Sequence, residues 1–143
     1  MTSQGHPYAR FRRAIERRSV AAAWATATEL EQVSLADSLS LVLLVRDREP
    51  MRYPKAALRW HARYCSERPR VSLEAAMSLL ALLIHLQCGD PRPPGRALRE
   101  LFTARGENEL ANAVRQWEAW LAPTRGATAC DDTSKTATES SPN

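Results

Sequence analysis

Two pairs of side chains have the spacing of metal ligands. His61 lies four residues before Cys65, and His85 lies three residues before Cys88. Imidazole nitrogen and thiolate sulfur both bind Zn²⁺, at bond lengths of about 2.0–2.3 Å. If the two segments form an antiparallel hairpin that turns near residues 68–71, the two histidines are about 12 Å apart along the helix axis, at about 1.5 Å per residue. The four groups then cannot meet at one ion, so we expect no metal site.

The chain lacks the patterns of nucleophilic or phosphate-transfer chemistry. No serine or cysteine sits in a glycine-rich elbow, and no histidine has an evident carboxylate partner in the sequence. The five glycines form neither a GxGxxG pattern nor a phosphate-binding loop. We interpret His85, in an apolar segment, as a core histidine. The sequence therefore predicts a protein that is not an enzyme, with no catalytic residue, no cofactor and no small-molecule ligand.

Basic residues are the feature with the most functional weight, and they gather in two segments, residues 10–18 and 52–70. Arginine forks can bind phosphates bidentately, and Trp60 or Tyr64 could stack on a base. The candidate anion-binding or nucleic-acid-binding residues are Arg10, Arg12, Arg13, Arg17, Arg52, Lys55, Arg59, Arg63 and Arg70. The alternative is a solvated basic surface with its aromatic rings turned into the core. No segment shows the pattern of a DNA-recognition helix after a tight glycine turn.

Composition is that of an ordinary soluble domain. The chain has 143 residues, 44% hydrophobic and 25% charged, with a net charge of +4. A chain of this size can bury a core without metal or disulfide staples. Its three cysteines form no disulfide framework, which favours a reducing, cytoplasmic compartment. The longest apolar runs fall well short of the ~20 residues that cross a bilayer, so we expect no membrane association.

The apolar pattern predicts an all-α fold of about seven helices in stacked helical hairpins. We expect a disordered arm over residues 1–8, a single helical domain over 9–122 and a disordered Ser/Thr-rich tail over 123–143. Within the domain, the first helix begins at Ala9 and the fourth covers residues 50–67. The second, third and fifth helices are capped by Ser19, Ser34 and Ser72, in that order. The sixth helix stops at Gly106, and Pro123 closes the seventh.

Two of these helices are apolar nearly all round, and we expect both to be central. They cover residues 35–46 and 73–87. The second helix places Trp24 on a face of small residues that is suited to close packing. The fourth helix has a packing side, formed by Tyr53, Ala57, Trp60 or His61, and Tyr64.

An internal repeat relates two segments at an offset of 38 residues. The segments VSLADSLSLVLLV, at 33–45, and VSLEAAMSLLALL, at 71–83, are identical at six of thirteen positions. Helical hairpins of about this length are the units of tetratricopeptide and similar repeats, although the tetratricopeptide signature itself is absent. A chance match between two leucine-rich helices is the alternative.

The segment from Phe11 to His61, and above all the run VSLADSLSLVLLVRDREPMRYPKAALRWHARY, resembles a group of short all-helical proteins of high-GC bacteria that have no assigned activity. The resemblance implies a helical fold and a bacterial cytoplasmic setting, and it implies no functional residue. From the sequence we therefore predict an interaction module that binds a protein partner or self-associates. The alternative is a nucleic-acid-binding protein that contacts phosphates through its first and fourth helices.

Overall fold

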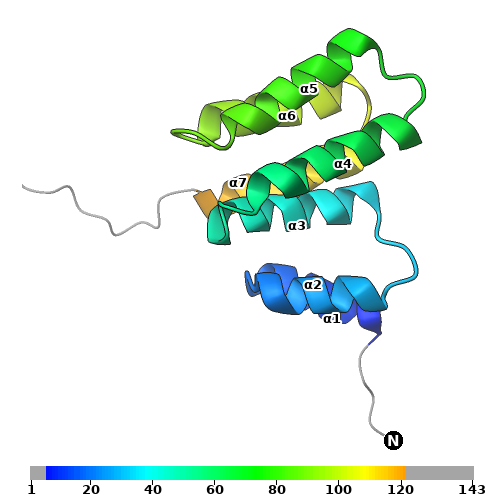
Figure 1. Cartoon of the computed structure of the whole chain (residues 1–143), viewed down its shortest axis with the longest axis vertical. Helices are drawn as coiled ribbons and strands as arrows, with labels where there is room; N and C mark the ends of the chain where they lie inside the picture. The colour runs from blue at the N-terminus through cyan, green and yellow to red at the C-terminus, as the bar shows by residue number, and fades with distance from the viewer. Residues whose placement is uncertain (1–5, 122–143) are drawn as a thin grey trace, which may run out of the picture.

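The computed structural model describes residues 6–121, which form seven α-helices and no strand (Figure 1). The predicted all-α fold of about seven helices is confirmed. The predicted tail and residues 1–5 of the predicted arm lie outside the described residues. The helices are α1 (Pro7–Glu16), α2 (Val20–Glu29), α3 (Leu35–Arg48), α4 (Tyr53–Glu67), α5 (Leu73–His85), α6 (Arg92–Ala104) and α7 (Asn108–Leu121).

Local sequence signals determine where several helices begin. The side chains of Ser19, Ser34 and Ser72 each accept a hydrogen bond from the backbone N–H three residues later, so the predicted caps of α2, α3 and α5 are confirmed. Helix α1 begins at Pro7, two residues before its predicted start. Proline is well tolerated there because the first turn of a helix does not use its N–H groups.

The helices lie in three tiers (Figure 1). The α1–α2 hairpin forms one outer tier, α3, α4 and α7 form the middle, and the α5–α6 hairpin forms the other outer tier. Each helix from α1 to α6 packs against the next one along the chain, as stacked hairpins require. Helix α3 also packs against α7, which is distant in sequence. In a solenoid each unit contacts only its neighbours, so this contact makes the fold a closed bundle.

Helix α3 is central, as predicted. It packs against α1, α2, α4 and α7, and so it has little surface left for solvent. Its buried residues are Leu35, Leu39, Ser40, Leu41, Val42, Leu43, Leu44 and Val45. Even the polar member of this set is satisfied, because the Ser40 hydroxyl donates to the carbonyl of Ala36 at 3.2 Å.

The prediction that α5 is a second central helix was wrong. Helix α5 packs only against α4 and α6 among the described helices, and within it only Leu79 and Leu83 are buried. Leu73 is 76% exposed and Met77 is 62% exposed. His85, which we interpreted as a core residue, is also exposed, with Nδ1 2.8 Å from the carbonyl of Ala81. An apolar pattern shows that a helix can be buried on every side, but which sides are covered depends on the neighbouring helices.

Helices α6 and α7 approach each other closely at Gly95. A Cβ atom at this position would lie 2.8 Å from Cζ3 of the buried Trp117 ring. A side chain here would have to displace a ring in the core, so glycine allows the indole to lie directly on the α6 backbone.

Helix α4 is tied to the α6–α7 connection through Tyr64. The Tyr64 hydroxyl donates to Glu107 Oε1 at 2.5 Å and accepts from Arg105 Nε at 3.2 Å. Burial, together with the hydrogen bond to Glu107, raises the pKa of Tyr64 from 10.0 to about 12. Burial also raises the pKa of Tyr53, whose hydroxyl donates to the carbonyl of Leu83 at 2.7 Å.

These pKa shifts predict a loss of stability at alkaline pH. The folded state favours the protonated phenol, so its contribution to the free energy of unfolding is complete below about pH 10 and is lost as the pH rises towards about 12. Urea unfolding across this range should show a falling stability, and Tyr64→Phe should reduce the slope while Tyr53 maintains part of it. Equal slopes in the two proteins would show that Tyr64 ionises alike in the folded and unfolded states.

Candidate binding groove

Helices α2 and α4 form the two walls of a groove whose floor is α3. Both walls pack against α3, and among the described helices they do not pack against each other (Figure 1). The groove has a volume of about 680 Å³. This volume is within the range of ligand-binding clefts, about 300–1,000 Å³.

The groove is apolar along its floor and on the α2 side. Leu41, Val42 and Val45 of α3 line it, together with Trp24 of α2. Trp24 is 43% exposed, so the prediction that it lies on a close-packed face was wrong. Met51, which precedes α4, also lines the groove and is 93% exposed. Exposed aromatic and methionine side chains are enriched at protein interfaces, because they bury much apolar area and adapt to a partner.

The α4 side of the groove is cationic. Its lining residues include four cations and no carboxylate; the cations are Arg52, Lys55, Arg59 and Arg63. These are the four candidate residues that the sequence places on the fourth helix. The structure therefore brings four of the nine candidate residues together beside an apolar floor.

Two of the four cations are already engaged. Arg52 donates to Glu49 at 2.6 Å, and its guanidinium carbon lies 5.8 Å from the centre of the Trp24 ring. Arg63 donates to Glu67 at 2.5 Å and to the carbonyl of Val33, which also lines the groove, at 2.7 Å.

The other two cations are available. Lys55 and Arg59 are exposed and form no ion pair with any residue in the described part of the chain. They lie one turn apart in the N-terminal half of α4. The positive charge of the groove that is open to a ligand is thus concentrated there.

The remaining candidate residues lie elsewhere. Arg10 pairs with Glu29, and Arg12 lies 3.4 Å from Asp37 of α3. Three others are exposed and do not line the groove: Arg13 of α1, Arg17 directly after α1, and Arg70 of the α4–α5 turn. The structure thus does not join the two basic segments into one surface at the groove.

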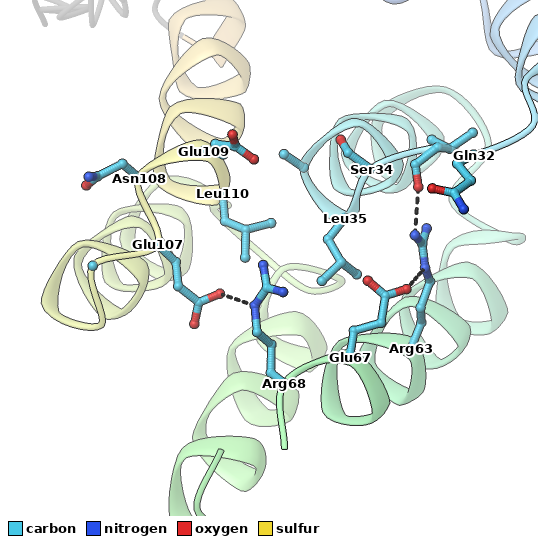
Figure 2. A pocket seen from close by; sticks show the side chains of 13 residues that line it. Gln32, Ser34, Leu35, Arg63, Glu67, Arg68, Glu107, Asn108, Glu109 and Leu110 are labelled. Atoms are coloured by element: carbon cyan, nitrogen blue, oxygen red, sulfur yellow. Dashed lines mark hydrogen bonds and ion pairs between the residues drawn. The ribbon is translucent and has the colours of Figure 1, made fainter. Parts of the chain in front are cut away.

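A second pocket, of about 710 Å³, lies where α3 and α7 begin and α4 ends. Figure 2 shows that its cations face carboxylates. Arg63 forms an ion pair with Glu67, and Nε of Arg68 lies 3.5 Å from Oε2 of Glu107. Glu109 also lines it. Because acidic residues balance its cations, this pocket has no evident preference for an anion, and the groove is the stronger candidate.

Sequence reasoning did not identify Trp24 and Met51 as site residues. The available signal was that Trp24 is the only aromatic side chain in a helix composed mainly of alanine and threonine, where it has few partners of its own size. Among the described residues, no group of three His, Cys, Asp or Glu side chains is placed to hold a metal ion. His61 Nε2 lies 2.8 Å from the carbonyl of Ala76 and 3.8 Å from Cys65 Sγ.

Comparison of the chain with protein-family models, curated proteins and solved structures found no match. The resemblance to short helical proteins of high-GC bacteria therefore stays a prediction. Among residues 6–121, no helix combines the length and the apolar character needed to span a membrane.

Proposed function

We propose that this protein is a non-enzymatic interaction module whose groove binds an acidic amphipathic helix of a protein partner. The observation that carries the proposal is the combination of an apolar floor with four lining cations and no carboxylate. An amphipathic helix can lay its apolar face in such a groove, with anchors spaced one turn apart. Asp and Glu on the flank of that helix would then face Lys55 and Arg59.

In this proposal the α4 cations attract and select the acidic partner. Exposed charges beside an interface contribute chiefly to the rate of association and to the choice of partner, whereas buried apolar anchors contribute most of the affinity. Trp24 and Met51 are the exposed anchors of the groove. Free thiols at Cys65 and Cys88 support the accompanying proposal of a reducing, cytoplasmic setting.

A nucleic acid fits the groove less well than a helix does. Phosphates would gain no favourable contact with the apolar floor that separates the cations from α2. The arginines of α1 also lie outside the groove. Binding to nucleic acid would depend steeply on salt, with a log–log slope close to the number of phosphates neutralised. This difference makes nucleic-acid binding a distinct outcome of the experiment.

The experiment is a selection from a displayed library of helical peptides, in which apolar, acidic and basic positions vary. We expect the enriched peptides to be amphipathic with acidic flanks. Their affinity should fall by about tenfold or more in the Lys55→Glu, Arg59→Glu double variant. The matched control is Arg96→Glu, Arg115→Glu, which changes the net charge equally at two exposed residues outside the groove.

Two results would overturn the proposal. One is a selection that yields no acidic peptide, or yields peptides that bind both double variants equally well. The other is tight, salt-steep binding of a fluorescent random duplex that the Lys55→Glu, Arg59→Glu variant loses, which would establish the nucleic-acid alternative.

A further inference from the structure

Helix α5 carries a second apolar surface, separate from the groove. Its outer stripe consists of Leu73, Met77, Leu80 and Ile84, at spacings of four, three and four residues. Leu73, Met77 and Ile84 are 76%, 62% and 57% exposed, and Leu80 is partly exposed. Leu79 and Leu83, which are buried, lie on a different side of the helix. Helix α5 thus has one apolar side packed in the bundle and another open.

The spacing of the outer stripe suits a second helix. Apolar residues that alternate at three and four residues form the seam of paired helices, because this spacing follows one side of the helix at about 3.5 residues per turn. In the outer tier, α5 has no helix on this side among the described residues (Figure 1).

The charges of α5 favour another copy of the same helix in antiparallel orientation. Glu74 near its beginning and His85 at its end are its only ionisable groups. In an antiparallel pair related by a two-fold axis, Glu74 of each copy lies near His85 of the other. The two helix dipoles are also antiparallel in this orientation, which is their favourable arrangement. A parallel pair would place like groups together.

The size of the seam determines how tight such a pair can be. A helix of this length is about 20 Å long, and its stripe alone covers less than the ~800 Å² per partner of a stable complex. Leu58 of α4, which is 59% exposed, can enlarge the surface, because the contacts of α4 with α5 place it level with the middle of α5.

We propose that two copies of this protein form a reversible two-fold dimer through the outer stripes of α5. The dissociation constant should lie between about 1 µM and 1 mM, as expected of an interface at the small end of the size range. This self-association uses a surface different from the groove, so it does not depend on the proposed function.

Sedimentation velocity over a range of concentrations tests the proposal. The mass of the wild-type protein should rise with concentration from 16.0 kDa towards twice that value. Met77→Glu should remain a monomer with an unchanged helical circular dichroism spectrum. Met51→Glu is the matched control, because Met51 is equally apolar, is 93% exposed and lies at the groove instead of on α5. It should dimerise as the wild type does and should weaken peptide binding.

The orientation has its own test. Glu74→Lys should weaken the dimer about threefold, because it replaces the carboxylate beside each His85 with a cation. Adding His85→Glu should restore the dimer, because each contact again joins a carboxylate to a basic group. A wild-type protein that stays monomeric up to about 1 mM would overturn the proposal. So would a Met77→Glu variant that dimerises like the wild type, or a Glu74→Lys defect that His85→Glu does not repair.

Discussion

Replacing Leu43 with alanine should lower the free energy of unfolding by about 3–5 kcal/mol, whereas Leu73→Ala should change it by less than about 0.5 kcal/mol. Leu43 is 0% exposed in the central helix α3, and Leu73 is 76% exposed in the outer helix α5. The first substitution leaves a cavity that close-packed neighbours cannot fill. The second removes a side chain that is already largely in water.

Urea unfolding followed by circular dichroism, at a concentration low enough to keep the protein monomeric, measures both changes. The comparison is controlled internally, because the same side chain is truncated in two helices of similar apolar character. Similar losses from the two substitutions would contradict the distinction between a central α3 and a peripheral α5.

Asp47→Ala should lower the free energy of unfolding by about 2–4 kcal/mol. The Asp47 carboxylate accepts from Arg18 at 2.6 Å, from Arg46 at 3.0 Å and from the Trp117 indole N–H at 2.9 Å. Its side chain is only 8% exposed. It therefore links the α1–α2 connection, α3 and α7 at one point.

Removing the carboxylate leaves two partly buried cations and an indole N–H without their partner. Arg18 and Arg46 remain 26% and 17% exposed, so water recovers part of the loss, and the expected value is below that of a fully buried pair. Glu67→Ala is the control: the Glu67 side chain is 42% exposed, and its ion pair with Arg63, one turn earlier in α4, should contribute less than about 0.5 kcal/mol. Equal effects of the two substitutions in urea unfolding would refute the role of Asp47.

Local features of the fold were predictable from the sequence. Serine caps follow directly from residue type and position. Leu110, Val114 and Trp117 recur at helical spacing, and all three are buried in α7. The packing side of α4 was predictable for the same reason, because Tyr53 and Tyr64 recur on one side of the helix. These features depend on the periodicity of a single element.

Features that depend on which helices meet could not be predicted. The patterns of α3 and α5 are nearly equivalent in sequence, and only the contacts of α3 with α2 and α7 make one central and the other peripheral. The groove likewise requires α2 and α4 on either side of α3. The stripe of cations on α4 could be seen in the sequence, but its apolar counterpart at Trp24 comes from a helix about 30 residues away.

The most direct test of the groove as the binding site is nuclear magnetic resonance mapping of the ¹⁵N-labelled protein with a selected acidic peptide. We expect the largest shift changes in α2 around Trp24, including its indole N–H, and along α4 at Lys55 and Arg59, with little change in α5. Changes centred on the α5 stripe, or on the arginines of α1, would contradict the account, because the peptide would then occupy a surface other than the groove.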